Sequence, residues 1–135
     1  MNKLSWHTEA ILTANTAKDG TGQTAYILTA EEQDLYVDRV VFQPIGTNVQ
    51  SVGRLFLNNG KLNTHASNNS PFAEITLPAT TLDETTAMTS QTITTDLWLP
   101  KGYRLNVTLG TTVAAGYRVT AVCGDYQDLQ SHPFR

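Results

Sequence analysis

The chain has 135 residues, with 9 Lys plus Arg against 12 Asp plus Glu, so its formal net charge is -3. This length fits one domain, and the acidic balance argues against a nucleic-acid-binding surface or a polybasic membrane patch. Charged residues make up only 16% of the chain, and much of its polarity comes from threonine. Because threonine is β-branched, this composition favours strands over helices.

Residues 1–7 lack the apolar core of a signal peptide, and no apolar run in the sequence approaches the roughly 18 residues that a membrane helix needs. We expect this segment to form a short N-terminal arm and residues 127–135 to form a C-terminal tail. Between them we expect a single domain, so residues 1–135 are interpreted as one folded unit with two extensions.

Alternation of apolar and polar residues predicts about eight strands. In the clearest, 103–109, apolar residues at the odd positions alternate with Arg104, Asn106 and Thr108, so we expect one buried face and one solvent-exposed face. The segment 8–14 is the weakest candidate. The complete set comprises residues 8–14, 24–30, 36–43, 49–57, 72–77, 91–99, 103–109 and 117–123.

Turn-forming residues separate these strands. Asn58-Asn59-Gly60 can adopt the positive φ angles of a turn, and Pro100-Lys101-Gly102 predicts a tight antiparallel hairpin. With a further reversal over 110–116, the last three strands should form a meander. No segment is long enough to be a crossover helix, so a parallel sheet is not expected. The predicted fold class is all-β: an antiparallel β-sandwich, jelly-roll-like, of about eight strands.

Residues typical of catalysis or metal binding do not cluster. His7, His65 and His132 are scattered and lack the spacing of paired metal ligands. Cys123 lies among apolar residues and is expected to be a small buried side chain. Gly20-Thr21-Gly22 precedes a strand rather than a helix, so we interpret it as a turn and not as a nucleotide-binding loop. We therefore predict no catalytic, cofactor or metal site, and no enzyme.

Aromatic residues stand out where a surface is usually polar. Strict alternation places Trp98 on the outer side of its strand, and both chain ends carry residues that are favoured at interfaces. The terminal aromatics either fold back onto the sandwich or bind a partner, and the sequence leaves both interpretations open. The candidate interface residues are Trp6, Trp98, His132, Phe134 and Arg135.

Several stretches between about 36 and 126 resemble small virion proteins of tailed bacteriophages. They are residues 36–44, 46–49, 54–60, 72–81, 99–105 and 116–126, which combine strand and turn sequences and hold no catalytic motif. The resemblance implies a jelly-roll capsid decoration (cement) protein that forms a homotrimer or homodimer on the shell of the major capsid protein. It also implies synthesis in the host cytoplasm and a place in the virion, and it transfers no functional residue.

A second interpretation is a component of the phage tail or fibre that binds a receptor or a carbohydrate. Such a module needs an exposed aromatic platform near polar loops, for which Trp98, Tyr103 and His65 are candidates. Saturable glycan binding would favour this alternative, and a position on the capsid would favour decoration.

Overall fold

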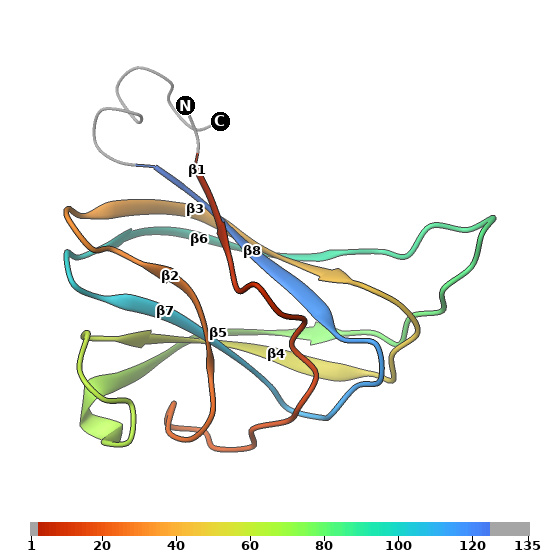
Figure 1. The fold of residues 1–135 in the computed structure, drawn as a ribbon, viewed down its shortest axis with the longest axis horizontal. Helices are drawn as coiled ribbons and strands as arrows, with labels where there is room; N and C mark the ends of the chain where they lie inside the picture. Colours follow the sequence, from red (N-terminus) through yellow and green to blue (C-terminus); the bar gives the residue numbers. More distant parts are fainter. Residues whose placement is uncertain (1–2, 125–135) are drawn as a thin grey trace.

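The computed structural model describes residues 3–124, and its fold is built from strands (Figure 1). The eight strands are β1 (Lys3–Trp6), β2 (Ala25–Thr29), β3 (Leu35–Pro44), β4 (Ser51–Asn58), β5 (Asn69–Leu77), β6 (Gln91–Leu99), β7 (Arg104–Leu109) and β8 (Tyr117–Gly124). A short 3-10 turn, η1 (Ala66–Asn68), precedes β5. The predicted all-β class is confirmed. Over residues 3–124 we find no helix with the length and apolar character that a bilayer crossing requires.

The strands form two antiparallel sheets packed face to face, seen as the upper and lower layers of Figure 1. Sheet A has the order β1-β8-β3-β6, and sheet B has the order β2-β7-β4-β5. The pairing is nested, because the first strand pairs with the eighth, the second with the seventh, the third with the sixth and the fourth with the fifth. A long antiparallel ribbon folded over on itself gives this order, so the predicted jelly-roll-like sandwich is confirmed.

The predicted meander of the last three strands is wrong. β6 pairs with β3 in sheet A, whereas β7 pairs with β2 and β4 in sheet B. The turn at 100–102 does form, and Tyr103 N–H donates to the Pro100 carbonyl at 3.0 Å. It carries the chain across the core from one sheet to the other, however, and makes no hairpin. Turn residues specify a local reversal, but burial of Leu99 and Leu105 between the sheets decides which strands become neighbours.

The inward side chains of both sheets build one core. Phe42 of β3 is completely buried and lies directly over Gly53 of β4, where a Cβ atom would approach the ring to 2.5 Å. The two sheets therefore touch closely at this point, and glycine is needed for steric reasons. Cys123 of β8 is 2% exposed, which confirms the prediction that it is a small buried side chain.

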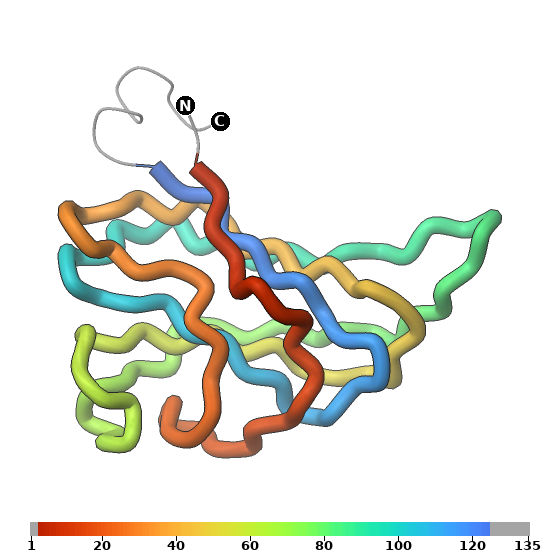
Figure 2. Tube along the Cα trace, viewed as in Figure 1, coloured from red at the N-terminus to blue at the C-terminus, as the bar shows by residue number. Residues whose placement is uncertain are grey.

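The first strand lies outside the segment that sequence alternation indicated. Residues 8–14 form only isolated bridges, Ile11 with Tyr117 and Ala14 with Leu109, so the predicted strand there is wrong. Residues 3–6 of the expected N-terminal arm instead form β1 alongside β8. The segment that follows β1 then crosses from sheet A to sheet B and closes one side of the sandwich (red to orange in Figure 2).

The outer face of sheet B is buried around its two central strands, β7 and β4. Phe56 of β4 and Asn106 and Thr108 of β7 point away from the core, yet they are only 2%, 0% and 3% exposed. Phe56 pairs with Asn106 across the two strands, and Arg54 pairs with Thr108, so large side chains of β4 flank those of β7. The prediction of a solvent-exposed face on 103–109 is therefore wrong.

Residues 15–24, here called the covering loop, pack against this face. Asn63 Nδ2 donates to the carbonyls of Gly20 and Gly22 at 3.1 and 2.7 Å, which fixes the loop to the β4–β5 connection. Gly20 has a φ of 80° and is so close to Asn69 that a Cβ atom would lie 2.7 Å away. The glycines at 20 and 22 thus form a turn, as predicted, and they allow close approach to sheet B.

Candidate interaction surface

One broad face of the molecule carries large apolar side chains that the rest of the fold leaves exposed: the outer face of sheet A. Leu4 and Trp6 on β1 are 60% and 47% exposed, and Trp98 on β6 is 41% exposed. Single exposed apolar side chains are normal on protein surfaces, whereas neighbouring ones, such as Leu4 and Trp6, indicate a candidate interaction site. The outward direction predicted for Trp98 is confirmed.

The strand registers fix the positions of both tryptophans on this face. Trp6 pairs with Thr120 of β8, whereas Trp98 pairs with Tyr36 of β3, which in turn pairs with Gly124 of β8. At the rise of a β-strand, these two levels of β8 are about 13 Å apart. β1 and β6 are also the two edge strands of sheet A. The two tryptophans therefore lie at diagonally opposite corners of the same surface.

The surface is hollowed beside Trp6. A shallow groove of about 340 Å³ is lined by Leu4, Trp6, Arg118 and Thr120 from β1 and β8. Arg118 Nη1 donates to the His7 carbonyl at 3.4 Å, which holds the guanidinium at this groove. An apolar floor beside a cation and a hydroxyl suits a partner that offers an apolar side chain next to a hydrogen-bond acceptor.

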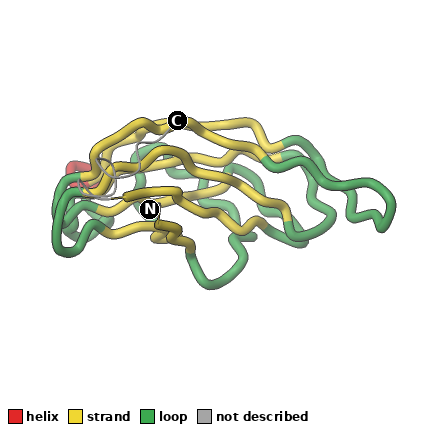
Figure 3. Tube along the Cα trace, turned by 90° about the horizontal axis from the view of Figure 1, so that it is seen from above, coloured by secondary structure: helices red, strands yellow, loops and turns green. Residues whose placement is uncertain are grey.

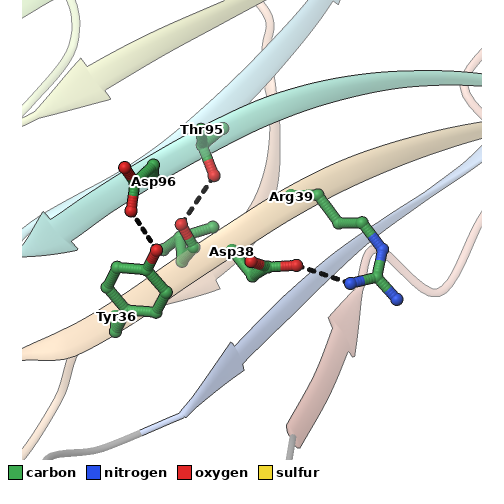
Figure 4. Close-up of polar contacts among 6 residues, drawn as sticks. Tyr36, Asp38, Arg39, Thr95 and Asp96 are labelled. Carbon is green, nitrogen blue, oxygen red and sulfur yellow. Dashed lines mark hydrogen bonds and ion pairs between the residues drawn. The ribbon is translucent and has the colours of Figure 1, made fainter. Parts of the chain in front are cut away.

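The opposite corner combines aromatic and acidic side chains. The rings of Tyr36 and Trp98 meet edge to face, with centroids 5.5 Å apart and an angle of 62° between their planes. The Tyr36 hydroxyl donates to Asp96 Oδ1 (Figure 4). This bond to the carboxylate, together with burial and the nearby negative charge, raises the pKa of Tyr36 to about 12. The hydrogen bond to Asp96 holds the ring of Tyr36 against the edge of Trp98.

An irregular backbone positions these groups. The β3–β6 register shifts between Val37 and Arg39, and Asp96 adopts a left-handed φ of 45°. Thr95 Oγ1 donates to the Val37 carbonyl at 2.7 Å across this irregularity (Figure 4). β-Bulges redirect side chains, and a non-glycine residue at positive φ persists only where its surroundings hold it. The bulge thus turns Asp96 toward Tyr36.

Two further charges stand beside the bulge. Arg39 Nη1 contacts Asp38 Oδ2 at 2.5 Å, and the two side chains are 44% and 25% exposed (Figure 4). An ion pair this exposed contributes little stability. Its contribution to the surface is a fixed donor and acceptor next to the aromatic pair.

The other residues singled out from the sequence do not extend this surface. His132, Phe134, Arg135 and the tail 127–135 lie outside the described residues. Tyr103 packs against the core, and His65 lies in the connection between β4 and β5 of sheet B, so neither joins Trp98 in a common platform.

Three residues of the surface were not singled out from the sequence: Leu4, Tyr36 and Arg118. Leu4 is two residues before Trp6, so period-2 spacing on a short strand would have indicated that the two share a face. Tyr36 and Arg118 join the surface only through pairing between distant strands, which no local pattern reveals.

The surface has no arrangement typical of catalysis. No group of three or more His, Cys, Asp or Glu side chains within residues 3–124 is placed to hold a metal ion. What the surface offers is apolar area, aromatic edges and a few fixed polar groups. Comparison of the chain with protein families, with curated proteins and with solved structures found no match in any of the three.

Proposed function

We propose that the protein is a capsid decoration (cement) protein of a tailed bacteriophage, which binds and stabilises the shell of the major capsid protein. The observation that carries the proposal is the outer face of sheet A, where Leu4, Trp6 and Trp98 are exposed on a jelly-roll sandwich. The resemblance of residues 36–126 to small phage virion proteins supports the same role. In this proposal, the face of sheet A contacts the shell.

The chemistry of this face suits attachment to a protein lattice. Aromatic side chains and arginine are enriched where proteins meet, and Trp6, Trp98 and Arg118 supply them here. A rigid sheet presents these groups with little loss of side-chain freedom. Because many copies act together on one shell, and as a homotrimer or homodimer each unit has several contacts, individual contacts need not be strong.

Binding to shells tests the proposal. Shells assembled from the major capsid protein of the same phage are mixed with the wild-type chain or with the double variant Leu4→Ser, Trp6→Ser, and bound protein is measured after sedimentation. We expect the double variant to bind at least tenfold more weakly, because it removes the apolar floor of the groove beside Trp6. Trp6→Ala alone should also weaken binding while leaving the fold intact.

Tyr26→Ser is the matched control. Tyr26 is an aromatic side chain of similar exposure, 42%, but it lies on β2 of sheet B. This variant should bind shells like the wild type. Equal binding of all variants, or equal losses from both faces, would contradict the assignment of the sheet A face.

A second candidate function is carbohydrate or receptor binding by a tail or fibre component. The observation that favours it is the corner of Tyr36, Trp98 and Asp96, where an exposed aromatic edge lies beside carboxylates and a guanidinium. In a glycan-binding screen, saturable and competable binding that Trp98→Ala abolishes and Trp6→Ala leaves unchanged would support this alternative. Absence of glycan binding together with binding to shells would exclude it.

A further inference from the structure

The loop between β5 and β6 projects from the molecule as a distinct feature. Residues 78–90 extend well beyond the strands they connect, at the far right of Figures 2 and 3. From here on, this β5–β6 loop is called the arm; it is distinct from the N-terminal arm expected for residues 1–7. At its base, Asn48 and Thr80 exchange two backbone hydrogen bonds of 3.2 and 2.9 Å, and Thr80 Oγ1 donates to the Gly46 carbonyl at 2.8 Å. The arm therefore leaves the sandwich in a defined direction.

The middle of the arm, residues 82–84 and here called the arm tip, holds one apolar and two acidic residues. Leu82 is 57% exposed, and its N–H donates to Thr47 Oγ1 at 2.9 Å. Asp83 Oδ1 accepts bonds from the N–H and the hydroxyl of Thr85, both at 2.9 Å, and these bonds lower the pKa of Asp83. With Glu84 beside it, the tip presents a leucine next to two carboxylates.

A hollow on the outer face of sheet B has the complementary character. It measures about 210 Å³, and its lining includes two cations, Lys18 and Arg54, the rings of Phe56 and Phe72, and one carboxylate, Glu74. Arg54 Nε pairs with Glu74 Oε2 at 3.1 Å, and that glutamate side chain is 65% exposed.

The positive charge of this hollow is only partly neutralised. Arg54 Nη1 is buried and has no hydrogen-bond partner among the described residues. Lys18 forms no ion pair within the part of the chain that the structure describes. With one carboxylate facing two cations, the hollow keeps an excess positive charge beside an apolar wall, which suits an acidic residue next to an aliphatic one.

A chain cannot fill its own hollow with its own arm. The arm leaves the sandwich at one end, whereas the covering loop that contains Lys18 runs beneath the opposite half of sheet B (Figure 1). We propose that the arm tip of one copy docks into the hollow of a second copy, with Leu82 against the exposed edge of Phe72 and with Asp83 and Glu84 near Lys18.

Such a contact joins two different patches of the same chain, so it is head-to-tail. Head-to-tail contacts close into a ring when the rotation between copies permits and otherwise extend into a filament. Because the hollow lies on sheet B, this contact leaves the outer face of sheet A of each copy available to a shell. This inference deepens the proposed function by naming the contact that builds the oligomer, but the association itself requires no shell.

Charge reversal tests the proposal in solution. The molar mass of the wild-type chain is measured by light scattering, together with variants Asp83→Lys with Glu84→Lys and, separately, Lys18→Glu. We expect a wild-type mass that is a whole multiple, larger than one, of the 14.8 kDa of one chain. Each reversal should raise the dissociation constant more than tenfold, and combining both reversals in one chain should restore association because opposite charges again face each other.

Glu31→Lys with Glu32→Lys is the control, because it makes the same charge change at exposed residues of the β2–β3 connection. It should leave the molar mass unchanged. A monomeric wild type, an equal effect of the control, or no restoration by the combined reversals would overturn the proposal. Shell binding is measured separately, so a failure of the arm contact and a failure of the decoration role are distinguishable.

Discussion

The outer faces of the two sheets differ in what covers them. On sheet B, Phe56, Asn106 and Thr108 point outward and are nevertheless buried beneath neighbouring side chains and the covering loop. On sheet A, Leu4 and Trp98 also point outward and are 60% and 41% exposed. The same strand alternation thus produces a second buried layer over the centre of sheet B, with Tyr26 and Phe72 exposed beside it, and leaves Leu4, Trp6 and Trp98 uncovered on sheet A.

This difference indicates that the two outer faces serve different purposes: one contributes to the stability of the fold, and the other is available to a partner. Burial of the outer face of sheet B adds apolar area to the folded state, whereas the exposed side chains of sheet A contribute little until a partner covers them. Changes to sheet B should therefore affect mainly the free energy of unfolding, and changes to sheet A should affect mainly binding.

The largest expected effect on stability comes from removing the buried ring of Phe56, and removal of the exposed ring of Trp98 is its comparison. Phe56→Ala should lower the free energy of unfolding by about 3 to 5 kcal/mol, because the buried ring leaves a cavity. Trp98→Ala should lower it by less than about 1.5 kcal/mol, because that ring is already 41% exposed. Urea denaturation of both variants measures this difference, and equal losses would contradict the contrast between the faces.

A smaller effect is expected from releasing the covering loop. Asn63→Ala removes the two hydrogen bonds to Gly20 and Gly22 and should lower the free energy of unfolding by about 2 kcal/mol. Hydrogen exchange should become faster in residues 15–24. Asn68→Ala also removes two hydrogen bonds within the same connection, one to the Leu62 carbonyl and one from Asn59 Nδ2, so it serves as the control and should leave the exchange of the covering loop unchanged.

A change in the opposite direction is expected at Asn106. Both polar atoms of this fully buried side chain lack hydrogen-bond partners among the described residues. Replacing a buried, unpaired amide by an apolar group of similar shape is neutral or stabilising. Asn106→Leu should therefore raise the free energy of unfolding by about 1 kcal/mol. A loss of stability in urea denaturation would show that the amide has a partner, such as a bound water molecule.

The smallest effect concerns the acidic corner of sheet A. Asp96→Asn removes the carboxylate that raises the pKa of Tyr36 to about 12, so this pKa should fall toward 10.0. The raised pKa stabilises the fold below pH 10, and this contribution is lost as the pH rises through about 12, because the unfolded tyrosine ionises first. Spectroscopic titration, with Tyr36→Phe to identify the signal, measures the shift. An unchanged pKa would contradict the role of Asp96.

The sequence allowed most of the strands to be located because alternation is a local property. Seven of the eight strands lie within the predicted segments or a few residues beyond them. β1 was missed because Lys3–Trp6 is only four residues long, which is too short for an alternating pattern to stand out. The assignment of β6 and β7 to different sheets depends on long-range pairing, which turn residues do not encode.

The candidate surface was predictable only in part, for the same reason. The outward direction of Trp98 follows from its own strand, and its exposure confirms it. That Trp6 and Trp98 share one face requires the registers of β1 with β8 and of β3 with β6. The burial of Asn106 depends on neighbouring strands and on a loop distant in sequence, so its polar character alone led to the wrong expectation.

The most direct test of the proposed function is a reconstruction of the intact particle at a resolution that shows the orientation of each sandwich. We expect the density on the capsid to fit this jelly roll with the outer face of sheet A, including Trp6 and Trp98, turned toward the shell subunits. The protein found at the tail tip, or bound to the capsid with that face turned toward solvent, would contradict the account.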